Sequence, residues 1–247
     1  MTKKQKLPIA FLTALALVLT VLMLFPKGIT ASAAWDGTVG EAFNGGDDSE
    51  SDPYIIANGE QLAYLAQQVN GIDNDDPGVS YEGKYFKLTA DIDLGGREWK
   101  PIGYGGYNSV NNRIKEVIFS GTFDGNGHTI SNIKIAVGKY SGFFGYSDGT
   151  IKNLYLENIN AESYHGIGGI CAYNYGTIDG CGLKSGTLKI SGSNGGDIGG
   201  IASNNYGTVS RCFNNADIIG GGDVAGVVAQ NNRGGVEPVH IKVLRFL

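Results

Sequence analysis

Apolar and polar positions recur along residues 121–236 in five similar stretches. Aligned from Gly121, Gly142, Gly169, Gly200 and Val227, the stretches need no gaps and lie 21, 27, 31 and 27 residues apart. One column then holds Thr122, Phe143, Ile170, Ile201 and Val228. A second column holds Ile130, Ile151, Ile178, Val209 and Val236. A period of this size is typical of a solenoid, whose units bury their apolar faces against their neighbours.

Each repeat contains short apolar segments interrupted by glycine. Within residues 150–156 the apolar side chains stand at 151, 154 and 156, a density typical of short β-strands separated by a corner. Glycine accounts for 40 of 247 residues, roughly twice its usual share of about 7%, and it suits corners where φ is positive. Parallel strands joined by a returning connection are almost always right-handed. We therefore expect an all-β fold, a right-handed parallel β-helix.

The first residues predict an export signal. Residues 1–33 combine Lys3, Lys4 and Lys6 with an apolar run and end in Ala-Ser-Ala, which predicts a signal peptide cleaved before Ala34. An uncleaved membrane anchor is the competing interpretation, because the apolar run is long. Cleavage removes four lysines and no acidic residue, which changes the net charge from −5 to −9. An acidic chain without clustered Lys and Arg argues against a nucleic-acid partner. We expect membrane contact only through the signal segment before cleavage.

The remaining chain divides into four parts. Residues 34–58 are polar and Gly-rich, and we interpret them as a loose lead-in. Residues 59–103 contain an amphipathic α-helix, which we expect to cap the open end of the stack, and then the first β-strands. Residues 104–236 are the β-helix coils, opened by an irregular insertion over 104–115. Residues 237–247 form an atypical C-terminal tail.

That tail departs abruptly from the repeat. The fifth stretch matches the fourth up to Val236, and then Val239 stands where the repeat has Cys212. If the reading frame starts from the third base of the Pro238 codon, the bases that follow can encode Cys at position 239. We therefore expect that truncation or a reading-frame slip after Glu237 has replaced the natural C-terminus, which sequencing of the locus tests.

Several motifs in order resemble the GLUG-motif repeat family of bacterial secreted and cell-surface proteins. The most specific of them is GTFDGNGHTI at residues 121–130. The others are DPYII at 52–56, EQL at 60–62, DIDL at 91–94, Trp99 with PIG at 101–103, and the Gly-Gly-Ile repeats. The repeats depart from the family pattern at Ile170, Ala172, Ile201 and Ser203. The resemblance implies an exported, adhesin-like β-helix, often one module of a longer chain.

Three carboxylates are candidates for chemistry. Asp91 and Asp93 flank Ile92 on a predicted strand, and Asp124 follows in a Gly-rich turn. Such acids can hold Ca²⁺ through oxygen ligands or cleave polysaccharide. However, Asp in Gly-Asn turns commonly accepts hydrogen bonds from its own backbone, so we assign these residues to structure and keep Ca²⁺ as the alternative. We predict no catalytic residue and no cofactor, since the three histidines are isolated and no His-Glu-x-x-His occurs.

Two further columns predict ladders along the stack. Cys181 and Cys212 share a column, where they form either a disulfide or a ladder of small apolar side chains, and we favour the ladder. Asn174, Asn205 and Asn232 predict a ladder of side-chain hydrogen bonds.

The expected function is that of a non-enzymatic exported module, secreted or displayed on the bacterial cell surface, which binds a glycan or protein. Tyrosines of the repeats provide the expected binding face, namely Tyr155, Tyr173, Tyr175 and Tyr206. Two alternatives stay open. One is a polysaccharide lyase or hydrolase of the β-helix type, and the other is a structural spacer from a larger surface protein.

Overall fold

The computed structural model describes residues 33–72, 76–108, 113–191, 195–232, 234–237 and 240–241. Nearly all of the predicted signal peptide, residues 1–32, lies outside these ranges, as do residues 242–247 of the tail. No helix within the described ranges is both long and apolar enough to cross a membrane.

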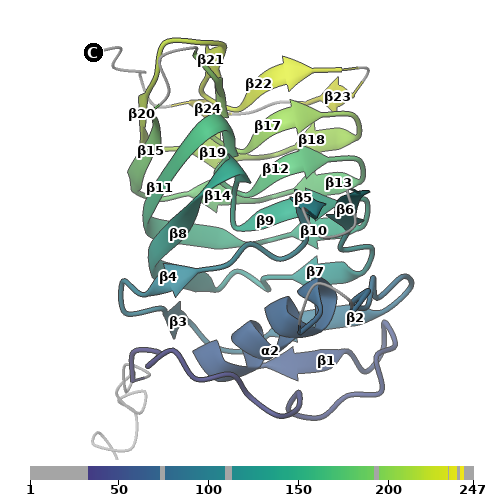
Figure 1. The fold of residues 1–247 in the computed structure, drawn as a ribbon. Helices are drawn as coiled ribbons and strands as arrows, with labels where there is room; N and C mark the ends of the chain where they lie inside the picture. The colour runs from purple at the N-terminus through teal and green to yellow at the C-terminus, as the bar shows by residue number, and fades with distance from the viewer. Residues whose placement is uncertain are drawn as a thin grey trace, which may run out of the picture. The chain divides into compact units, whose positions relative to one another are not determined.

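The chain winds through three parallel sheets stacked coil upon coil (Figure 1). Sheet 1 contains, in spatial order, β1 (Tyr54–Ile56), β2 (Tyr85–Leu88), β7 (Thr122–Asp124), β10 (Thr150–Lys152), β13 (Thr177–Asp179), β18 (Thr208–Ser210) and β23 (Gly235–Val236). Sheet 2 contains β3 (Ile92–Asp93), β4 (Glu98–Trp99), β8 (Thr129–Ser141), β11 (Tyr155–Gly168), β14 (Gly182–Leu183), β15 (Gly186–Ile190), β16 (Asp197–Gly199), β19 (Phe213–Asn214), β20 (Asp217–Ile219), β21 (Val224–Ala225) and β24 (His240–Ile241). Sheet 3 contains β9 (Phe144–Ser147), β12 (Cys171–Asn174), β17 (Ala202–Asn205) and β22 (Val228–Asn231). The expected all-β solenoid is thus confirmed, and the right hand of its coils stays a prediction.

The sheet 1 register defines the main apolar ladder. Ile151 pairs with Phe123 on one side and with Ile178 on the other, and Val209 and Val236 continue the same column. The prediction of Ile130 for this ladder was wrong, because the chain turns a corner after Asp124 and Ile130 begins a strand of sheet 2. There it pairs with Ile92 and Leu156.

The cysteine column follows from sheet 2. Gly182 pairs with Phe213, which places Cys181 and Cys212 at equivalent positions of adjacent coils. Both thiols are buried and free, and so is Cys171. In the structure these cysteines therefore pack in the core without a disulfide.

The asparagine ladder runs along the end of sheet 3. Asn174 Nδ2 donates to Asn205 Oδ1 at 2.7 Å, and Asn205 Nδ2 donates to Asn231 Oδ1 at 3.0 Å. The third rung is Asn231 and not the predicted Asn232. The gapless alignment missed this. Relative to that alignment, the fifth coil has one residue fewer before this position and one residue more in the turn that follows it.

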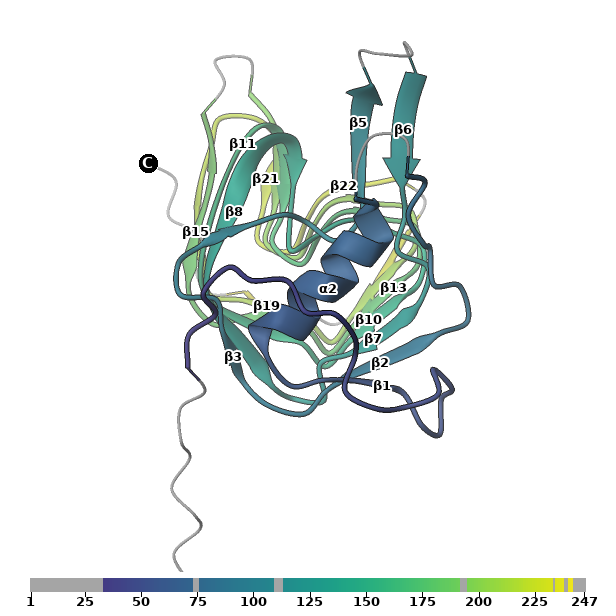
Figure 2. The same cartoon turned by 60° about the horizontal axis from the view of Figure 1, so that its bottom comes forward.

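The helix α2 (Gly59–Asn70) lies across the interior of the coils at the N-terminal end (Figure 2). Asn58 caps it by accepting a hydrogen bond of 2.9 Å from the amide of Gln61. Leu62, Leu65 and Val69 have no exposed surface, so the apolar side of the helix closes the core.

Two expectations for the N-terminal half need correction. The lead-in is not loose, because Phe43 stacks on Tyr54 at 4.7 Å and contacts Phe86 edge-on at 5.2 Å. These ring contacts fix the lead-in against sheet 1.

The insertion before the repeats is also regular, and it does not form a coil of the β-helix. It forms an antiparallel hairpin of β5 (Tyr104–Asn108) and β6 (Arg113–Val117), which projects beside sheet 3 (Figure 2).

Candidate functional site

Four tyrosines from three successive coils lie together at two neighbouring positions of the repeat, here named the tyrosine row. Its members are Tyr146, Tyr173, Tyr175 and Tyr206. The ring of Tyr173 stacks on that of Tyr146, with centroids 4.7 Å apart and planes 8° from parallel. Tyr175 stacks on Tyr206 at 5.0 Å, and Tyr173 and Tyr175 lie 6.3 Å apart. Because strands of adjacent coils are about 4.8 Å apart, rings at equivalent positions meet face to face.

The row is exposed to solvent at one end and buried at the other. Tyr175 and Tyr206 are 42% and 43% exposed, whereas Tyr146 is buried at 7%. Burial raises the pKa of Tyr146, Tyr173 and Tyr175, and the carboxylate of Glu116 on the hairpin adds to this effect at Tyr146 and Tyr175. These hydroxyls therefore stay protonated at neutral pH and can both donate and accept hydrogen bonds.

The structure brings together three of the four tyrosines predicted for the binding face, and Tyr146 joins them. Tyr155 does not belong to the row. It lies on β11 of sheet 2, where its ring is 5.8 Å from that of Phe213 and 5.4 Å from Lys184 Nζ. Sequence spacing could not separate these positions, because every second strand residue points outward on each of the three sheets.

The three candidate carboxylates are each used in a corner of the coil. Asp91 Oδ1 accepts from the amide of Thr129 at 2.9 Å, which is the main cause that lowers the pKa of Asp91. Asp93 Oδ1 accepts from Gly95 N and Asn132 Nδ2, each at 2.8 Å. Asp124 Oδ1 accepts from Asn126 N at 2.8 Å and from Asn153 Nδ2 at 3.1 Å. In the described part of the chain, no three His, Cys, Asp or Glu side chains gather as a metal ion would require.

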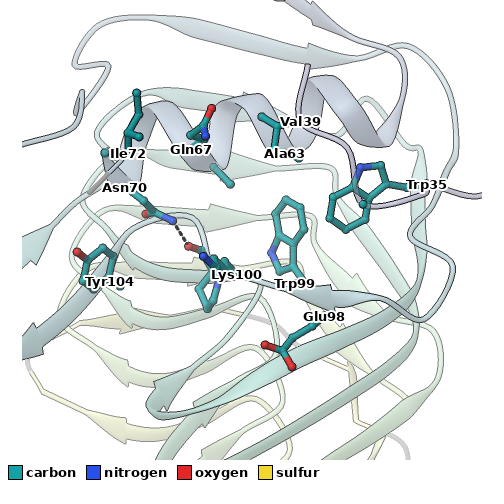
Figure 3. Close-up of a pocket in the computed structure, with 14 residues that line it drawn as sticks. Trp35, Val39, Ala63, Gln67, Asn70, Ile72, Glu98, Trp99, Lys100 and Tyr104 are labelled. Carbon is teal, nitrogen blue, oxygen red and sulfur yellow. Dashed lines mark hydrogen bonds between the residues drawn. The ribbon is translucent and has the colours of Figure 1, made fainter. Parts of the chain in front are cut away.

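A second candidate site is a cleft of about 600 Å³ at the N-terminal end, here named the end cleft. Its walls are α2, the lead-in over residues 35–39 and the corner over residues 98–104 (Figure 3). Trp35 and Trp99 lie side by side in it, with centroids 6.1 Å apart and planes at 72°. The sequence analysis missed this site and assigned its residues to the loose lead-in, the capping helix and the first β-strands. The presence of both tryptophans of the chain in these two segments is the signal that could have indicated it.

The fold and these surfaces define a β-solenoid with two candidate binding regions, and comparison with known proteins agrees with that class. No protein-family model matches the chain. The chain is 35% identical over 211 residues to a "Putative Gly-rich membrane protein" of Evansella cellulosilytica, covering 78% of this chain and 22% of that protein. It is 32% identical over 168 residues to "Halomucin" of Haloquadratum walsbyi, covering 65% of this chain and 2% of that protein. The chain thus spans about a fifth of the first relative and about a fiftieth of the second.

Among solved structures, the chain resembles that of a "putative immunoglobulin A1 protease" from Bacteroides ovatus. The TM-score is 0.53 at 20% sequence identity, and the match covers 83% of this chain and 80% of the other. At this identity the likeness concerns the fold alone.

Proposed function

We propose that the chain is a non-enzymatic module of the bacterial cell surface that binds an extracellular glycan or protein through the tyrosine row. The observation that carries the proposal is the packing of four tyrosines over three successive coils. A solenoid repeats each side-chain position at every coil, so the pairs Tyr146/Tyr173 and Tyr175/Tyr206, at neighbouring positions, form one continuous patch. Tyrosine suits such a patch because its rigid ring supplies contact area and its hydroxyl supplies a hydrogen bond.

The stacking geometry limits the ligand chemistry. Within the row, the faces of Tyr146 and Tyr173 cover each other, and those of Tyr175 and Tyr206 do the same. A ligand on the row therefore meets the hydroxyl groups and the ring surface that stacking leaves open, which favours a partner with both hydrogen-bonding groups and some apolar surface. The exposed carboxylate of Glu116 beside the row disfavours a strongly acidic partner.

Three lines support the proposed location at the cell surface. The first is the predicted signal peptide. The second is the resemblance to the GLUG-motif family, and the third is the printed name of the relative from Evansella cellulosilytica, which calls it a membrane protein. The non-enzymatic assignment is supported by Asp91, Asp93 and Asp124, whose carboxylates accept hydrogen bonds from corner groups.

A binding array tests the proposal. The full chain is applied to immobilised glycans and extracellular proteins, in parallel with a Tyr175→Ala/Tyr206→Ala double variant. We expect binding by the parent and a loss of at least tenfold in the variant. Tyr164→Ala is the matched control, since Tyr164 is 55% exposed and does not belong to the row.

Three results would overturn the proposal. Parent-level binding by the double variant would exclude the row as the binding surface, and no binding to any probe would favour a spacer. Release of unsaturated sugar from acidic polysaccharides, lost in Asp91→Asn or Asp93→Asn, would make the chain a lyase.

A further inference from the structure

The end cleft is a preformed cavity that the proposed function does not use. Its volume of about 600 Å³ falls within the range of about 300–1,000 Å³ that is usual for small-molecule sites. It is lined from three segments far apart in the sequence, and none of the tyrosines of the row contributes to it. The cleft is therefore a separate feature of the molecule.

Hydrogen bonds hold the walls of the cleft in place. Asn70, at the end of α2, donates from Nδ2 to Pro101 O at 2.9 Å and accepts at Oδ1 from Gly103 N at 2.9 Å. Asn70 thus fixes the helix to the corner that forms the opposite wall (Figure 3). Because these bonds join the walls of the cleft directly, binding would cost little ordering of the site.

The two tryptophans are also held firmly. Trp99 stacks on Phe143 with planes 4° from parallel and donates from Nε1 to Phe143 O at 3.2 Å. Trp35 donates from its backbone amide to Asp93 O at 2.7 Å and from Nε1 to Thr38 O at 2.6 Å. Both indole N–H groups are therefore used within the protein. What Trp35, which is partly exposed, offers to a ligand is the apolar surface of its ring.

Polar side chains border the same cavity without partners. Gln67 on α2 and the corner residues Glu98 and Lys100 all line the cleft. Among the described residues, no hydrogen bond or ion pair engages any of these three side chains. The cleft thus combines an apolar wall with free donors and acceptors.

The charges of the cleft decide between classes of ligand. Glu98 and Lys100 contribute one negative and one positive charge, so the lining has no net charge. A phosphate or a polyanion would need clustered cations, and a metal ion would need a cluster of ligands that the described residues lack. A neutral ligand with an apolar face and a polar rim fits best, which is the chemistry of a pyranose ring.

We propose that the end cleft binds a neutral saccharide unit, with one ring packed against Trp35 and its hydroxyl groups bonded to Gln67 and Lys100. The amide of Gln67 donates and accepts, and the ammonium of Lys100 donates. Together they match hydroxyl groups that both donate and accept.

Intrinsic fluorescence provides a site-specific test, because Trp35 and Trp99 are the only tryptophans of the chain. The full chain is titrated with glucose, galactose, N-acetylglucosamine and their tetrasaccharides, and with glucuronate and a neutral tripeptide as comparison probes. We expect a saturable change in tryptophan emission with at least one neutral saccharide, at an affinity at least tenfold above that for glucuronate. A saturable response only to the tripeptide, or no response to any probe, would overturn the proposal.

Variants separate binding from folding. Gln67→Leu and Lys100→Met keep the size of the side chain and remove its hydrogen bonds, and each is expected to weaken saccharide binding about fivefold to tenfold. Gln68→Leu is the matched control, since Gln68 is the next residue of the helix and does not line the cleft. Unchanged affinity in both cleft variants, with thermal melting like that of the parent, would refute the assignment. The Tyr175→Ala/Tyr206→Ala variant should keep this binding, so failure here is distinct from failure of the tyrosine row.

Discussion

Asn174 and Asn205 lie at equivalent positions of adjacent coils, and the Nδ2 of Asn174 donates to the Oδ1 of Asn205 at 2.7 Å. Neither residue has exposed surface. Because a buried polar group without a partner costs free energy, each amide depends on its neighbour in the next coil. The ladder therefore couples the coils to one another at this corner of the solenoid.

Replacing Asn205 tests this coupling. Asn205→Ala removes the acceptor of Asn174 Nδ2 and the donor to Asn231, and we expect a loss of about 2 kcal/mol in the free energy of unfolding. Urea denaturation measures it. Asn215→Ala is the control, since Asn215 is exposed and should change stability by less than about 0.5 kcal/mol. Equal midpoints for Asn205→Ala and the parent would show that the ladder does not stabilise the stack.

The apolar ladder of sheet 1 supports a second prediction. Ile178 has no exposed surface and pairs with Ile151 and Val209 in the coils on either side. Ile178→Ala leaves a cavity in this column, and we expect a loss of about 2–5 kcal/mol. Thr177→Ala changes the neighbouring residue, whose side chain is only partly buried, and should cost less than about 0.5 kcal/mol. Similar losses in both variants would contradict the register.

The sequence sufficed to predict the solenoid, because coils that stack in register must repeat apolar residues and corner glycines. It did not suffice to predict which residue of the first repeat joins the apolar ladder of sheet 1, because Phe123 and Ile130 are both apolar and equally suited to it. The outer residues would have decided between them, since Thr122, Thr150, Thr177 and Thr208 share one position in four coils. Polar outward residues therefore carried register information that the apolar pattern lacked.

The end cleft could not be predicted because no local pattern encodes it. Trp35, Gln67 and Lys100 come from a loop, a helix and a corner, and only the packing of the helix across the end of the stack brings them together. The hairpin was missed for a related reason. Its strands Tyr104–Asn108 and Arg113–Val117 lack the alternation of a half-buried strand, because they pair with each other in a projection from the stack.

A pH-dependent prediction concerns Asp197 on β16. Burial raises the pKa of Asp197, and the nearby Asp223 carboxylate adds to the effect. A carboxyl group whose pKa is higher in the folded state destabilises the fold when it is ionised, and this penalty disappears as the pH falls below the unfolded value of about 3.9. We therefore expect Asp197→Asn to raise the melting temperature at pH 7 and to leave it unchanged at pH 3. Asp217→Asn, at an exposed position of β20, is the control and should have little effect at either pH. A lower melting temperature for Asp197→Asn at pH 7 would contradict the assigned repulsion.

The last prediction concerns the three cysteines. Cys171, Cys181 and Cys212 are free, and at most 1% of each is exposed. Burial raises the pKa of Cys171 and Cys181, so their reactive thiolates are scarce at neutral pH. A hydrogen bond with Cys181 lowers the pKa of Cys212, whose thiol is protected by its burial instead. We expect a thiol-alkylating reagent at pH 7 to leave the native chain unmodified, and to modify all three cysteines in denaturant without a reductant. Intact-mass measurement counts the added groups, and a denatured sample treated with reductant is the control. If only one thiol reacts in denaturant until reductant is added, two of the cysteines form a disulfide, and Cys181 with Cys212 is the pair that the register places on adjacent coils.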